Sequence, residues 1–128
     1  MSKQYDDSRY GVTKILTFPG HCDLTAVAGN VSHVVFDEDI ILTEFGVVIT
    51  EYVTGVATAT VQLRESSTVL GEITVPSLSI IGTVLSTTTL TTTAINSGDT
   101  LIFYKNLSNI TTGECDGYIK YKERFVSG

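Results

Sequence analysis

The sequence predicts an all-β domain: a single antiparallel β-sandwich or jelly-roll-like fold with an extended N-terminal arm. β-Branched and aromatic residues recur in short runs from residue 31 onward, and turn-forming residues interrupt them about every ten residues. No segment repeats its apolar residues with the period of an amphipathic helix. The chain has 128 residues, which suits one domain with one modest core.

The strand pattern is clearest in the first half of the compact part. Residues 57–64 alternate apolar and polar side chains, as expected when one face of a strand is buried. Gly46 lies inside a long apolar run and indicates a bulge or a point of close packing. The predicted strands span residues 31–36, 40–52, 57–64, 68–75, 79–85, 87–95, 100–106 and 118–125.

The second half is rich in serine and threonine, and threonine suits a pleated surface better than a helix. Residues 79–85 and 87–95 are therefore predicted as strands. Residues 100–106 carry apolar side chains on both faces, which is typical of a central or interface strand. A loop over residues 107–117 is expected before the last strand.

The first 30 residues differ from the rest, because they mix charges that cancel and show no sustained alternation. We therefore predict an arm over residues 1–30 and a sandwich domain over residues 31–128. Ile15, Leu16 and Phe18 would anchor the arm on a neighbouring subunit or shell protein. Deleting residues 1 to about 20 is expected to spare the fold.

The charge balance excludes some partners. Eight basic and 14 acidic residues give a net charge of −6, so the long-range basic field that attracts nucleic acid or anionic lipid is absent. No run of apolar residues is long enough for a membrane-spanning helix. We expect neither a nucleic acid nor a membrane as partner, and no cofactor.

His21-Cys22-Asp23 is the only cluster with a catalytic look. A cysteine and a histidine can act as nucleophile and base, but adjacent residues rarely place both side chains productively. A metal site that adds His33 lacks a recognised ligand spacing. Asp37-Glu38-Asp39 offers carboxylates to calcium, yet a solvated turn explains it more simply. A structural role is the leading interpretation for each.

Cys22 and Cys115 are the only cysteines. The N-terminal residues lack the apolar core of a secretory signal, so we expect free thiols in a protein made in a reducing cytosol. The two cysteines would pair only if the fold brings them together, which the sequence leaves open.

The last predicted strand places Lys120, Lys122 and Arg124 on one face together with Tyr118. Such a basic row either guards an edge strand against stray pairing or contacts an acidic surface of a neighbouring subunit. The surface near Ile102, Tyr104, Tyr118 and Lys120 is expected to be buried between subunits of a closed homo-oligomer.

Residues 40–106, with a closing strand over residues 117–121, resemble the small β-sandwich modules of tailed-phage virion proteins, such as capsid decoration (cement) proteins, head fibres and related appendages. The resemblance covers about 90 residues and consists of a pattern of strands and turns rather than an invariant motif. The segments that carry it are Thr54–Leu63, Thr68–Val75, Ala94–Leu101 and Gly117–Tyr121.

This resemblance implies a non-enzymatic virion protein that decorates and stabilises a capsid. Its partners would be the major capsid protein or another virion protein, and copies of itself, with a trimer favoured. It would be made in the host cytoplasm and carry no catalytic residues. The alternative is a glycan- or host-surface-binding module of a fibre or tail, although the chain has no tryptophan to stack on a sugar. A small hydrolase built on His21 and Cys22 is the third reading.

Overall fold

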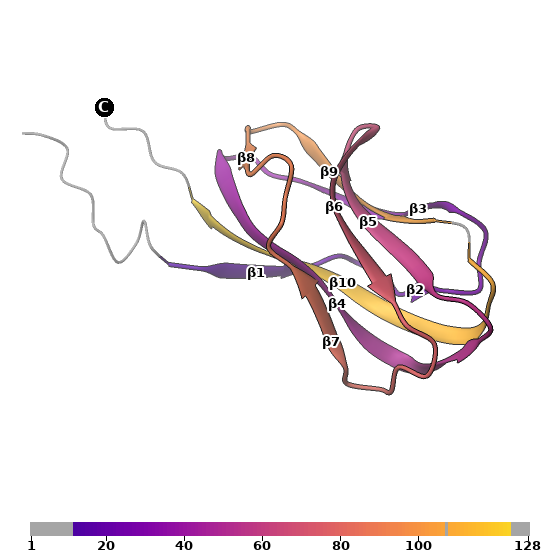
Figure 1. The fold of residues 1–128 in the computed structure, drawn as a ribbon. Helices are drawn as coiled ribbons and strands as arrows, with labels where there is room; N and C mark the ends of the chain where they lie inside the picture. Colours follow the sequence, from indigo (N-terminus) through magenta and orange to yellow (C-terminus); the bar gives the residue numbers. More distant parts are fainter. Residues whose placement is uncertain (1–11, 107, 124–128) are drawn as a thin grey trace, which may run out of the picture.

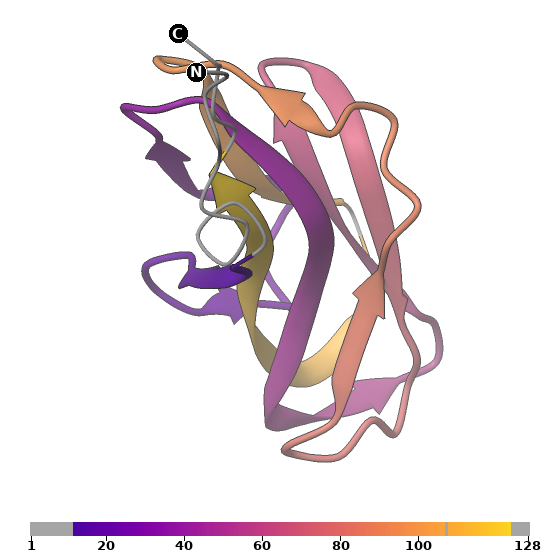
Figure 2. The same cartoon turned by 90° about the vertical axis from the view of Figure 1, so that its left-hand side faces the viewer.

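In the computed structural model, the chain folds into two antiparallel β-sheets packed face to face as a sandwich (Figures 1 and 2). The structure describes residues 12–106 and 108–123. Every regular element in these two ranges is a strand, which confirms the predicted all-β class.

The larger sheet contains β1 (Lys14–Thr17), β2 (Cys22–Asp23), β4 (Ile40–Gly55), β7 (Val84–Thr87), β8 (Ala94–Ile95) and β10 (Ile110–Glu123). Its main path runs β1-β10-β4-β7, and the two-residue strands extend it, β2 along β10 and β8 along β4. The long strands β4 and β10 pair along most of their length and form the centre of this six-stranded sheet.

The second sheet contains β3 (Gly29–Val35), β5 (Ala59–Glu65), β6 (Thr68–Val75) and β9 (Thr100–Lys105), in the order β3-β9-β5-β6. Burial alternates along β9, where Leu101 and Phe103 face the core while Ile102 and Tyr104 lie half-buried on the outer face. The apolar character that the sequence shows on both faces of this strand therefore has two causes: a core face and a partly covered outer face.

Aromatic rings join the two sheets. The Phe103 ring lies 5.5 Å from that of Phe18 and 6.0 Å from that of Phe45, measured between centroids. Gly117 makes room for Phe103, because a β-carbon at position 117 would lie only 2.7 Å from a ring carbon. Around these rings the core contains Leu24, Ile40, Leu42, Val47, Ile49, Val53, Val61, Leu63, Leu70, Val75, Ile95, Leu101 and Ile119.

A register shift between β4 and β10 preserves the inside–outside pattern of the sheet. Lys120 opposes Glu44, whereas Tyr121 opposes Leu42, so one extra residue is accommodated on β4. The extra residue forms a β-bulge, so Leu42 faces the core and Glu44 the outer face although they are only two residues apart. Tyr121 consequently packs against the core and Lys120 stays on the outer face.

The expected arm over residues 1–30 is corrected where the structure describes it. Lys14–Thr17 pairs antiparallel with β10, and Phe18, Cys22 and Leu24 are buried in the core. The strands in this segment, β1 and β2, have four and two residues and are too short to display a period of two in the sequence. Residues 1–11 lie outside the described ranges, so the arm remains a prediction only there.

Two other expectations also need correction. Residues 110–117 belong to β10 rather than to a loop; Gly113, at a φ of 147°, and a series of register shifts make this half of the strand irregular. The Ser/Thr-rich residues 79–95 contain only β7 and β8, because most of this segment runs along the edge of β4 without regular pairing. Threonine content alone therefore overpredicted strand.

Candidate interaction surface

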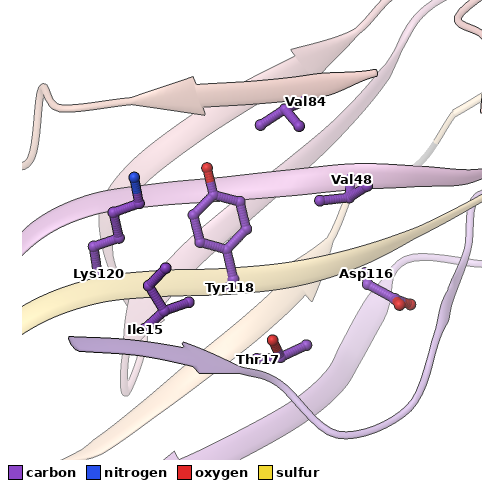
Figure 3. A pocket seen from close by; sticks show the side chains of 7 residues that line it. All are labelled: Ile15, Thr17, Val48, Val84, Asp116, Tyr118 and Lys120. Atoms are coloured by element: carbon purple, nitrogen blue, oxygen red, sulfur yellow. The ribbon is translucent and has the colours of Figure 1, made fainter. Parts of the chain in front are cut away.

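The outer face of the six-stranded sheet carries a groove of about 400 Å³ (Figure 3). Four strands supply its walls, β1, β10, β4 and β7, which are neighbours in the sheet. Because side chains alternate along each strand, the groove residues share the face opposite the core. They are Ile15, Thr17, Val48, Val84, Asp116, Tyr118 and Lys120.

Tyr118 lies at the centre of the groove and is held there by its neighbours. Its ring covers Gly46 on β4, where any β-carbon would collide with the ring. Its hydroxyl donates a hydrogen bond of 2.6 Å to Oε2 of Glu44, and Nζ of Lys120 lies 3.8 Å from the same oxygen. Burial, followed by the hydrogen bond to Glu44, raises the pKa of Tyr118 to about 12. The floor of the groove is therefore a fixed, uncharged aromatic surface.

The walls of the groove are apolar and open to solvent. The side chain of Ile15 is 63% exposed and that of Val84 is 56% exposed. Outside the groove lining, the segment before β7, residues 76–83, carries three further exposed apolar side chains: Leu78, Ile80 and Ile81. Backbone hydrogen bonds to β4 hold this segment in place, including one of 2.7 Å from the Leu78 amide to the Val53 carbonyl. Exposed apolar side chains on fixed backbone are typical of a surface that a partner covers.

Asp116, which lines the groove, is paired with His21, which does not. His21 Nδ1 and Asp116 Oδ1 lie 2.5 Å apart, linking the segment before β2 to β10. The hydrogen bond to Asp116 and the charge of that carboxylate raise the pKa of His21. Both side chains are partly exposed, so solvent screens this pair.

The outer face of the four-stranded sheet is different, because its polar side chains satisfy one another. Gln62 donates to Glu72 at 2.6 Å and accepts from Nε of Arg64 at 2.8 Å. The Arg64 guanidinium also lies 3.5 Å from the centre of the Tyr104 ring, a cation–π contact. The Tyr104 ring on this face is thus covered by a neighbouring side chain of the same sheet.

The structure divides the residues predicted for contacts into separate groups. Ile15, Tyr118 and Lys120 come together in the groove. Ile102 and Tyr104 lie on the outer face of the other sheet, Leu16 packs against the core, and Phe18 lies within it. Lys122 is half-buried on β10 opposite Ile41, and Arg124 lies outside the described ranges.

Four groove residues were missed from the sequence: Thr17, Val48, Val84 and Asp116. Val48 follows Gly46 by two residues, so the period of a strand places both on one face. No signal in the sequence indicates that β1 and β7 flank the same pair of central strands. Only the order of the strands in the folded sheet shows that these two strands lie on the two sides of β10 and β4.

The side chains of His21, Cys22 and Asp23 have three different partners. His21 binds Asp116, Cys22 is buried opposite Cys115, and Asp23 accepts hydrogen bonds from Thr25. These bonds to Thr25 lower the pKa of Asp23. The cluster that looks catalytic in the sequence is therefore dispersed in space.

A second cleft of about 310 Å³ lies beside the segment that joins β2 to β3. Lys105 lines it, although this side chain is almost entirely buried. Its ammonium donates to the carbonyl oxygens of Ala26 and Asn106, and burial lowers its pKa. A lysine committed to two backbone carbonyls acts as a tie between segments.

The acidic turn at residues 37–39 accepts a hydrogen bond from a backbone amide of another turn. Oδ1 of Asp39 accepts a hydrogen bond of 2.8 Å from the Ser97 amide, which joins this turn to the one before β9. Within the described ranges, no three His, Cys, Asp or Glu side chains are grouped so as to hold a metal ion. The same part of the chain contains no helix long and apolar enough to cross a membrane.

Comparison with protein-family models, with curated proteins and with solved structures finds no match to this chain.

Proposed function

We propose that this chain is a non-enzymatic structural protein that associates with copies of itself through the outer face of the six-stranded sheet. The observation that carries this proposal is the open groove around Tyr118, with exposed Ile15 and Val84 in its walls. In the cell, we propose that it decorates and stabilises the capsid of a tailed phage.

A second copy of the chain is the occupant that the charges favour. The chain carries a net charge of −6, so two copies repel each other over most of their surfaces. The groove offers a contact surface with little of this repulsion, because most of its lining is apolar and the carboxylate of Glu44 is held by Tyr118 and Lys120. Apolar residues surrounded by satisfied polar groups are typical of the centre of a protein–protein interface.

The strand order supports the viral part of the proposal. Leaving aside the two-residue strands β2 and β8, the eight remaining strands run first-eighth-third-sixth in one sheet and second-seventh-fourth-fifth in the other. This order supports assigning the sandwich to the jelly rolls, an architecture used by viral capsid domains and by lectins. Fold alone does not assign function, so the proposal rests on the groove rather than on the strand order.

The tyrosine rings favour assembly over glycan binding. A sugar-binding site needs an aromatic face open to solvent. Among the described tyrosines, Tyr104 is covered by Arg64, Tyr118 is buried, and the Tyr121 ring contacts Phe36 edge to face. Tyr52, at 40% exposure, lies outside the groove.

The viral role is tested by fractionating a culture that produces the protein on a density gradient. The proposal predicts that the protein sediments with DNA-containing particles, in many copies per particle, and that electron microscopy places it on the shell. Protein found only in slowly sedimenting fractions of a culture that releases particles would contradict the role. Specific binding on a glycan array by the isolated protein would support the alternative instead.

A further inference from the structure

Cys22 and Cys115 face each other across two paired strands. They are register partners in the antiparallel ladder between β2 and β10. Both are fully buried in the core, and both are free thiols. They come from segments far apart in the sequence, and the fold alone makes them neighbours.

The hydrogen-bond pattern sets the distance between the two backbones. The Leu24 amide donates to the Gly113 carbonyl at 3.0 Å, so this pair occupies a hydrogen-bonded position of the ladder. Such positions recur every second residue in an antiparallel pair, which places Cys22 and Cys115 at the next one. The α-carbons of a hydrogen-bonded pair lie roughly 5.5 Å apart, within the roughly 4.4–6.8 Å that a disulfide spans.

The two thiols interact directly in the folded protein. The hydrogen bond between them lowers the pKa of Cys22, and the positive charge of Lys105 acts in the same direction. The Cys115 thiol has its pKa raised by the same hydrogen bond and by burial. These opposite shifts agree with the register in placing the two sulfur atoms side by side.

We propose that Cys22 and Cys115 form an oxidation site, at which a small-molecule disulfide converts the two thiols into a cross-strand disulfide. Before folding buries the pair, one of the two thiolates attacks one sulfur of the small disulfide, forming a mixed disulfide and releasing one small thiolate. As β2 pairs with β10, the other cysteine attacks the sulfur of the first and releases the second small thiolate. The two protein thiols lose two electrons to the small disulfide, and their protons end on the two released small thiols.

The bond would fix the edge of the sheet beside the groove. It would tie β2 to β10 next to His21 and Asp116, which are themselves paired, and Asp116 lines the groove. The reduced form suits synthesis in a reducing compartment, and the oxidised form suits the oxidising conditions outside a cell. This inference stands independently of the proposed function, because it rests on the β2–β10 ladder alone.

The test is to refold the full chain from denaturant in a mixture of reduced and oxidised glutathione. Refolding gives the reagent access to both thiols before burial. We expect product chains that are not linked to one another by disulfides and that have lost two hydrogen atoms each. They should resist alkylation after denaturation and yield one peptide pair linked through Cys22 and Cys115. The thermal midpoint should exceed that of the reduced protein by on the order of 10 °C, with an unchanged circular dichroism spectrum.

Three outcomes would overturn the proposal. The refolded protein would keep both alkylatable thiols in excess oxidised glutathione, or would carry glutathione on one cysteine, or would melt at a lower temperature once oxidised. Cys115→Ala is the matched control: without the second thiol, the gain in thermal midpoint on oxidation should disappear. The wild-type measurements decide the question even where this variant folds poorly.

Discussion

The ring of Tyr118 lies directly over Gly46, so that the two residues together form the floor of the groove on the outer face of the sheet. The relationship is reciprocal. Gly46 provides the space, and the hydrogen bond from the Tyr118 hydroxyl to Glu44 keeps the ring in it. Gly46 is thus the close-packing point that its place in an apolar run predicts.

Gly46→Ala should destabilise the protein by about 1–3 kcal/mol, because the added methyl group displaces a packed ring. In a Tyr118→Ala background the same change should be neutral or stabilising by about 0.5–1 kcal/mol, because glycine is unfavourable inside a strand. Urea unfolding of the four proteins in this double-mutant cycle measures the coupling. Equal effects of Gly46→Ala in both backgrounds would contradict the contact.

The raised pKa of Tyr118 predicts that the stability of the folded protein falls at alkaline pH. Its pKa in the folded protein is raised to about 12, above the ordinary value of about 10 for tyrosine. The folded state therefore holds this proton more tightly than the unfolded state does. Its contribution is complete below pH ~10 and is lost as the pH rises to ~12. Over that range wild-type stability should fall more steeply than that of Tyr118→Phe, and parallel curves would refute the assignment.

The pair of His21 and Asp116 predicts that stability also depends on pH in the range where histidine titrates. Because the pKa of His21 is raised in the folded state, the pair stabilises the protein below the ordinary histidine pKa and loses its effect as the pH rises through the raised value. NMR titration should show that Asp116→Asn lowers the pKa of His21. Asp23→Asn is the control, because Asp23 binds Thr25 instead and its loss should leave His21 unchanged.

Phe18→Ala tests whether the N-terminal segment belongs to the core. Phe18 is buried and its ring stacks near that of Phe103, so its truncation should cost about 3–5 kcal/mol. The comparison is Ile15→Ala, three residues earlier on the exposed face, which should change the free energy of unfolding by less than about 1 kcal/mol. Similar small losses for both variants would restore the interpretation of this segment as a dispensable arm.

Residue patterns predicted the strands that have one buried face. The strand predicted over residues 68–75 matches β6, and the alternation over 57–64 becomes β5 with small shifts at both ends. These elements follow from the period of two, which is a local property. Ala59, Val61 and Leu63 are all buried, as the alternation requires.

Patterns failed where pairing depends on distant segments. β1 and β2 exist because β10 offers them a free edge, and nothing within residues 14–23 indicates this. The same limit explains why the predicted contact residues separate. Ile102 and Tyr118 both alternate outward, but they belong to different sheets, and strand order decides which outward faces coincide.

Self-association through the groove is the central claim, and sedimentation equilibrium of three proteins tests it most directly. Val84 borders the groove and Val35 lies on β3 of the other sheet, and both are 56% exposed on four- and seven-residue strands. The account predicts that wild type and Val35→Asp form the same oligomer, whereas Val84→Asp dissociates at the same concentration. A wild-type monomer at every concentration, or equal dissociation of both variants, would contradict it.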